Sequence, residues 1–199
     1  EMSNNNEKII TNCGSIEKRI GKKPEYLRYS AAHSTIILNN TNISELIENK
    51  SSKRWPQNIQ FIADEDVNHY YWSASHDGYK NNFNKIIKRK INISKKHFNI
   101  TGEDIIVSTK LSKKNELFNI RFHLTPSCTS LLTNNKESVL IKTKLNNSYI
   151  FKSDHKLSLD GSISILSDNK IEKTKQIIIS GYTLNPKKII KWSISQVTK

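Results

Sequence analysis

The stretch YYWSASHDGY, residues 70–79, decides the fold class of this chain. Successive side chains of an extended strand point to opposite faces, so Tyr70, Trp72 and His76 share one face. We expect a strand whose aromatic face is buried. It ends in a polar pair, His76 and Asp77, which a catalytic interpretation would make a base and its orienting carboxylate.

The basic run IIKRKINI, residues 86–93, follows after residues 80–85 and places Arg89 on one face with isoleucines. A buried guanidinium needs a carboxylate partner, because an unpaired buried charge costs several kcal/mol. Asp77 is the nearest candidate in the sequence. We favour an Asp77–Arg89 ion pair that fixes the register of a hairpin, and the alternative is a His/Asp/Arg cluster that faces a ligand.

The rest of the chain consists of short extended runs separated by turn signals such as Asn134-Asn135 and Asp160-Gly161. This spacing, without a long amphipathic helix, is typical of an all-β protein and predicts a two-layer antiparallel β-sandwich over residues 1–199 as a single domain. In residues 119–124, we expect Ile120, Phe122 and Leu124 to point inward. The other expected strands are residues 8–13, 31–39, 59–63, 103–110, 139–143, 148–152, 156–159, 162–166, 175–180 and 189–195.

The chain is strongly basic, with 32 Lys and Arg against 18 Asp and Glu and a net charge of +14. Such a surface attracts polyanions. Codon usage in an AT-rich genome would produce the same excess without a partner, and both explanations stay open. Nucleic acid is the less favoured polyanion, because the aromatic stacking pattern of an RNA-recognition sheet is missing.

Cys13 and Cys128 lie too far apart in the sequence to suggest a disulfide framework, so two buried thiols are the default expectation. No run approaches the ~18 apolar residues of a membrane-spanning helix, and we expect no membrane partner. The first residues do not look like a natural start, so we expect the chain to be part of a longer protein.

Four short strings occur in an order that resembles the C-terminal β-sandwich domain of the heparinase II/III-like polysaccharide lyases. They are SAAHST (residues 30–35), SHDGY (75–79) followed by a basic triplet, RFHLTP (121–126) and QIIISG (176–181). Together they cover nearly the whole chain. The family's triplet usually begins with His, whereas this chain has Ile87 before Lys88 and Arg89, so the resemblance does not support proton transfer by the triplet.

The resemblance implies a supersandwich-like fold and an N-terminal α/α-toroid domain, absent here, that carries the catalytic residues. Such lyases cleave uronate-containing polysaccharides by β-elimination in a cleft between toroid and sandwich. We therefore expect this chain to form one wall of the cleft for an acidic glycan and to be inactive alone, with no catalytic residues of its own. A bacterial periplasm or cell envelope is the location that the family implies. The alternative is a non-catalytic basic β-sandwich module that binds polyanionic glycans.

The resemblance also implies a possible structural zinc site, to which His33 would contribute one ligand. The family's Asp ligand aligns with Asn12, and no His precedes His33 to provide the others. An amide is a poor zinc ligand, so we expect no metal in this chain, although zinc is possible in the full-length family. A histidine that is hydrogen-bonded into the strands is the favoured interpretation of His33.

Substrate-binding candidates are Arg28, His76, Arg121 and His123. Arg121 and His123 share the face opposite the inward-pointing residues of 119–124, where Arg121 is suited to bind a carboxylate or sulfate. A solvated outer face of a sandwich would have the same pattern. Arg28 closes the densest basic patch, which also contains Lys18, Arg19, Lys22 and Lys23 and is otherwise a solvated loop.

Overall fold

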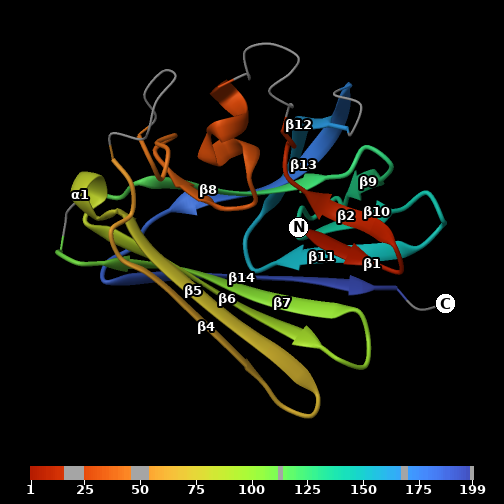
Figure 1. The fold of residues 1–199 in the computed structure, drawn as a ribbon, viewed down its shortest axis with the longest axis horizontal. Helices are drawn as coiled ribbons and strands as arrows, with labels where there is room; N and C mark the ends of the chain where they lie inside the picture. Colours follow the sequence, from red (N-terminus) through yellow and green to blue (C-terminus); the bar gives the residue numbers. More distant parts are fainter. Residues whose placement is uncertain (16–24, 46–53, 112–113, 167–169, 198–199) are drawn as a thin grey trace.

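The computed structural model describes residues 1–15, 25–45, 54–111, 114–166 and 170–197. Within these ranges the chain forms two antiparallel sheets that pack face to face as a sandwich (Figure 1). This confirms the predicted all-β class. No helix among the described residues is long and apolar enough to cross a membrane.

The smaller sheet has the order β1-β2-β8-β13-β12, with β3 also paired to β8. All its pairings are antiparallel, and β8 lies in its middle. Its strands are β1 (Met2–Asn4), β2 (Glu7–Thr11), β3 (Ile36–Leu38), β8 (Leu117–Leu124), β12 (Leu157–Ile165) and β13 (Ile171–Tyr182).

The larger sheet has the order β4-β5-β6-β7-β14-β11-β10-β9 among the described residues. In the described part of the chain, three short helices accompany the two sheets: η2 (Glu25–Arg28), η3 (Ser30–Ala32) and α1 (Lys80–Phe83). The strands are β4 (Ile59–Glu65), β5 (His69–Tyr79), β6 (Lys85–Ser94), β7 (Asn99–Ser108), β9 (Thr129–Leu132), β10 (Ser138–Lys142), β11 (Ser148–Ser153) and β14 (Lys187–Gln196).

The core lies between the two sheets and is built from alternate residues of each strand. On β8, Ile120, Phe122 and Leu124 are fully buried, which confirms the inward row predicted for this strand. Phe122 meets Trp192 of β14 at 4.9 Å between ring centroids, so aromatic contacts join the middles of the two sheets.

The aromatic face of β5 is the main departure from the sequence prediction. Tyr70 and Trp72 pair with Ile93 and Ile91 of β6 on the inner side of the sheet, as the alternation predicts. They nevertheless stay 43% and 45% exposed, because the smaller sheet does not extend over this end of the larger one. In Figure 1 the ends of β4 and β5 project away from the smaller sheet.

The predicted Asp77–Arg89 pair does not form, and this expectation is corrected. Arg89 instead donates two hydrogen bonds to Asp104 of β7, from Nε to Oδ1 at 2.7 Å and from Nη2 to Oδ2 at 2.9 Å. Asp77 accepts hydrogen bonds from the backbone N–H groups of Gln57 and Asn58 at 2.8 and 3.1 Å. Directly paired residues of neighbouring strands share a face, so the partner of Arg89 comes from the next strand, β7.

Candidate functional site

A hollow of about 490 Å³ on the outer face of the smaller sheet brings together two of the predicted binding residues, Arg121 and His123. Its floor is formed by β8, β12 and β13, and its rim by η2 and η3. The lining includes Cys13, Tyr26, Tyr29, Arg121, His123, Ser162, Lys173 and Gln176.

A small second core holds the η2–η3 segment on this face of the sheet. Leu27 and Ala32 pack against Cys13 and Ile165. The Cys13 N–H donates to the Ala32 carbonyl at 3.0 Å, and the Cys13 carbonyl accepts a hydrogen bond from Ile165 N–H at 3.0 Å. The rim is therefore fastened to the strands by backbone hydrogen bonds as well as by apolar contact.

Arg121 supplies the positive charge of the floor. Its Nη1 donates to Gln176 Oε1 at 2.9 Å, and Gln176 Nε2 in turn donates to the Gly161 carbonyl at 2.7 Å. Arg121 Nε is buried and has no hydrogen-bond partner within the described part of the chain. A buried donor without an acceptor costs free energy. A carboxylate or sulfate oxygen in the hollow would be a suitable acceptor for this guanidinium.

His123 lies next to Arg121 in the hollow but is only 2% exposed. Its Nε2 lies 2.9 Å from the Ala31 carbonyl and therefore donates to it, which leaves Nδ1 as an acceptor for the Ser162 hydroxyl at 2.8 Å. Burial lowers the pKa of His123 to about 4. We therefore revise the expected substrate contact of His123. Its neutral imidazole, with both ring nitrogens hydrogen-bonded, holds the rim on the sheet. Arg121 remains as the cation of the pair.

Cys13 completes the inner side of the hollow. Its Sγ lies 3.7 Å from His123 Nδ1 and 3.9 Å from Ser162 Oγ, and burial raises the pKa of the thiol. It is thus a neutral thiol. Both Cys13 and Cys128 are free in this structure.

The hollow also contains side chains that the sequence alone did not identify. Tyr26 and Tyr29 are exposed beside the hollow, and Lys173 of β13 adds a second cation. Arg28, a predicted binding residue, is exposed between the two tyrosines in the chain. Aromatic rings beside cations form a surface that suits sugar rings with acidic substituents. The signal for Tyr26 and Tyr29 was weak, because isolated tyrosines in a basic loop have no periodicity.

The donor groups present do not match the zinc site that the family resemblance implies. Asn12 Oδ1 accepts a hydrogen bond from Gly14 N–H at 2.9 Å, so the amide is occupied in a local turn. Within the described ranges, no group of three or more His, Cys, Asp or Glu residues is placed to hold a metal ion. His33 together with an amide does not fit a closed tetrahedral zinc site.

The other predicted residues lie away from the hollow. His76 belongs to β5 of the larger sheet, where its Nδ1 accepts a hydrogen bond from Gly78 N–H at 3.3 Å and burial lowers its pKa. Asp77 and Arg89 are also on the larger sheet, in the separate contacts described above. Lys18, Arg19, Lys22 and Lys23 lie outside the described residues.

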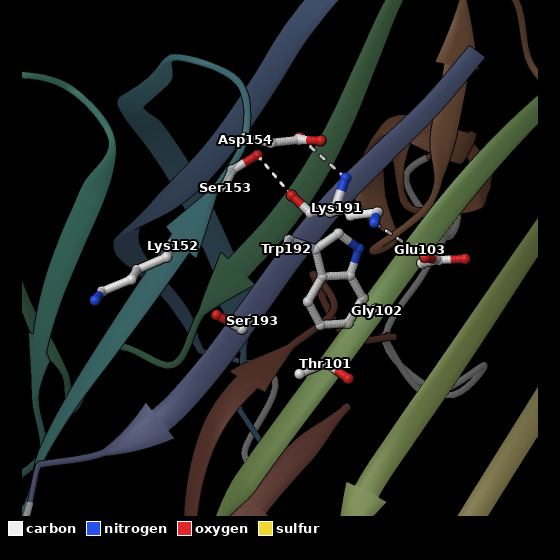
Figure 2. Close-up of a pocket in the computed structure, with 9 residues that line it drawn as sticks. All are labelled: Thr101, Gly102, Glu103, Lys152, Ser153, Asp154, Lys191, Trp192 and Ser193. Carbon is white, nitrogen blue, oxygen red and sulfur yellow. Dashed lines mark hydrogen bonds and ion pairs between the residues drawn. The ribbon is translucent and has the colours of Figure 1, made fainter.

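A second hollow, of about 400 Å³, lies on the outer face of the larger sheet, over β7, β14 and β11 (Figure 2). Lys191 Nζ reaches Glu103 Oε1 at 3.8 Å, and Asp154 Oδ1 accepts a hydrogen bond from Lys191 N–H at 3.0 Å. Its ionic groups are therefore largely paired with one another, and it contains none of the predicted binding residues. The hollow beside Arg121 is the better candidate for an anionic ligand.

Comparisons with known proteins agree with this architecture. The crystal structure of a mutant of the heparan sulfate lyase HepC from Pedobacter heparinus superposes with a TM-score of 0.68 at 14% identity, covering 88% of this chain and 26% of that chain. A heparinase III with methylated lysines gives 0.70 at 11% identity, with coverages of 96% and 28%. A further heparinase III gives 0.60 at 15% identity, with coverages of 86% and 24%.

At these identities the likeness establishes the fold, and this chain spans about a quarter of the length of each of these structures. No curated protein matches the sequence. The family model described as "Heparinase II/III-like, C-terminal" matches residues 1–193, nearly the whole chain. On this match and on its two-sheet sandwich, the chain belongs to the heparinase II/III-like C-terminal domain family.

Proposed function

We propose that this chain is the C-terminal domain of a polysaccharide lyase and forms one wall of the cleft that holds an acidic, uronate-containing glycan. The single observation that carries the proposal is the hollow beside Arg121, where a guanidinium with an unused buried donor lies among exposed tyrosines and Lys173. An anionic sugar that binds the half-buried Arg121 side chain would neutralise local positive charge.

In β-elimination, a base removes the C5 proton of the uronate, and the developing charge on the carboxylate must be stabilised. Arg121 and Lys173 are suited to bind anionic groups of the polymer, and the tyrosine rings to contact its sugar faces. We assign the proton transfers to an N-terminal toroid domain, which the family resemblance implies. The chain alone would then bind the glycan without cleaving it.

The same resemblance supports two broader proposals. An acidic glycan as substrate and a bacterial periplasm or cell envelope as location both fit a lyase that acts on polymers taken from outside the cell. Heparan sulfate and alginate are both candidate glycans, because both carry uronate carboxylates.

The first experiment incubates the chain with heparin, heparan sulfate and alginate and follows the ultraviolet absorbance of the unsaturated uronate product. We expect no turnover. Retention of each glycan is measured in parallel by affinity electrophoresis, and we expect retention of at least one of them. Turnover by this chain alone would contradict the assignment of catalysis to another domain.

The second experiment compares Arg121→Ala with Lys142→Ala. Both changes remove one positive charge, but Lys142 is exposed on the larger sheet, away from the hollow. We expect Arg121→Ala to weaken retention by about tenfold or more, because a charge-assisted hydrogen bond contributes roughly 1.5–3 kcal/mol. Lys142→Ala should have a small effect. Equal losses in the two variants would point instead to a module that binds polyanions by net charge alone.

A further inference from the structure

The β4 strand is an unprotected edge of the larger sheet. All seven of its residues are exposed, including Ile59 at 71%, Phe61 at 66% and Ile62 at 65%. One side of β4 pairs with β5, and no strand among the described residues pairs with the other side. Figure 1 shows β4 as the outermost strand at that end of the sheet.

Soluble proteins usually protect such an edge with lysine, proline, a bulge or a short length. Between residues 59 and 65 there is no lysine and no proline, and the register with β5 continues without a shift. At the opposite end of the same sheet, β9 is only four residues long. The free edge of β4 therefore has the hydrogen-bonding groups and the apolar side chains of a strand that lacks its neighbour.

We infer that β4 pairs with β4 of a second copy of this chain, antiparallel and about a twofold axis at Ile62. In this register Ile62 lies opposite itself, and Phe61 lies opposite Ala63, so a large side chain meets a small one. Asp64 lies opposite Gln60, so no carboxylate faces another carboxylate across the pair. A twofold contact that uses the same surface on both copies is the commonest form of association in soluble oligomers.

The inner face of the hairpin continues this contact. Phe61 and Ala63 of β4 lie beside Ala74 and Trp72 of β5, because these residues are direct partners in the sheet. When two copies join along β4, these four residues of one copy and the same four of the other form one apolar strip across the twofold axis. An exposed apolar area of this kind in a soluble protein marks an interaction surface.

The charge of the hairpin does not prevent this pairing with a second copy. The chain has a net charge of +14, yet residues 59–79 contain Asp64, Glu65, Asp66 and Asp77 and no lysine or arginine. Lys95 of the turn after β6 reaches the tip of the hairpin, where its Nζ donates to Glu65 Oε2 and to the Asp66 carbonyl, each at 2.6 Å, and so offsets part of this acidic charge. In the antiparallel arrangement the two acidic tips point in opposite directions, roughly 25 Å apart at ~3.3 Å per residue. This distance exceeds the Debye length of about 8 Å at physiological salt. An acidic glycan does not suit this surface, so the inference is independent of the proposed function.

The first test is sedimentation velocity of the chain over a wide concentration range. We expect a monomer–dimer equilibrium, and Ile62→Lys should raise its dissociation constant by roughly a hundredfold, because it places two ammonium groups against each other on the axis. Leu131→Lys is the matched control, because Leu131 is 67% exposed on β9, the other edge of the same sheet. Circular dichroism and thermal unfolding of each variant check that the fold is retained.

The second test fixes the register. Directly opposed residues in an antiparallel pair have Cα atoms roughly 4.5–5.5 Å apart, within the range that a disulfide spans. In oxidised glutathione, Ile62→Cys should form an intermolecular disulfide while glutathione is reduced, and Leu131→Cys should remain monomeric on a non-reducing gel. A wild-type chain that is monomeric at every concentration would overturn the inference, and so would an Ile62→Lys variant that dimerises as well as the wild type. Other occupants of this edge, such as a further domain of a longer protein, would give that monomeric result.

Discussion

At the scale of single residues, the buried carboxylate of Asp104 is the centre of one ionic cluster. Asp104 is 1% exposed and accepts both hydrogen bonds from Arg89 as well as one from Trp192 Nε1 at 2.9 Å. Arg89 also donates to the Ser34 carbonyl, which belongs to the segment leading into β3. This cluster therefore links three strands of the larger sheet to the layer opposite.

We predict that Asp104→Asn lowers the free energy of unfolding by about 3 kcal/mol, because it leaves the Arg89 charge without its counter-ion in the interior. Urea denaturation measures the change. The matched control is Glu103→Gln, which removes the neighbouring carboxylate from an exposed pair with Lys191 and should cost less than about 1 kcal/mol. Equal effects of the two substitutions would show that the buried cluster has no special role.

The buried imidazole of His123 predicts a pH dependence of stability. Its folded-state pKa of about 4 lies below the value of about 6.5 that an unfolded histidine has. Between these values the unfolded chain binds a proton that the folded chain does not, so the free energy of unfolding decreases as the pH falls. We expect His123 to account for a loss on the order of 2 kcal/mol between pH 7 and pH 4.5.

Urea denaturation at several pH values tests this expectation. The slope of unfolding free energy against pH should become shallower in His123→Gln, whatever the substitution does to stability at pH 7. His97→Gln removes an exposed histidine and should retain the slope of the wild type. An unchanged slope in His123→Gln would argue against a buried neutral imidazole.

At the scale of elements, the packing of side chains between the paired strands β7 and β14 depends on one glycine. A Cβ atom added to Gly102 would lie 2.1 Å from Cζ2 of Trp192, its direct partner on β14. The indole therefore occupies the space that a side chain at position 102 would fill. This close fit also allows Trp192 Nε1 to reach Asp104 two residues along β7.

We predict that Gly102→Ala destabilises the fold by about 2 kcal/mol, because the indole and the strand must move to relieve the overlap. Thermal unfolding followed by circular dichroism measures the effect. Gly161→Ala is the control: it lies in β12 with nothing within 4 Å of an added Cβ, and it should be neutral or slightly stabilising. If Gly161→Ala loses as much stability as Gly102→Ala, the effect comes from the backbone conformation of strand glycines and not from overlap with Trp192.

At the scale of the whole molecule, the two sheets differ in width. Among the described residues the larger sheet has eight strands and the smaller has six, and the smaller sheet does not extend over one end of the larger one (Figure 1). The core therefore occupies only the part of the larger sheet that faces β8 and its neighbours. The candidate glycan site and the proposed dimer edge lie on different sheets, so both can be occupied at once.

The sequence by itself determined the fold class and the two faces of its strands. Period-two alternation is a local property, and it correctly placed Ile120, Phe122 and Leu124 inward and Arg121 outward. It also placed Tyr70 and Trp72 together on one face of β5, and Arg89 with Ile91 and Ile93 on one face of β6. The family resemblance rested on four short sequence segments. It agrees with the family model, which matches residues 1–193.

Only the tertiary structure decided which side chains meet. The partner of Arg89 is Asp104 because β6 pairs with β7 in a register that no local pattern specifies. Likewise, His123 is buried because the η2–η3 segment crosses the outer face of β8, and Tyr70 and Trp72 are exposed because the smaller sheet ends before it covers them. Burial depends on what packs against a face from elsewhere in the chain, whereas alternation defines only the face.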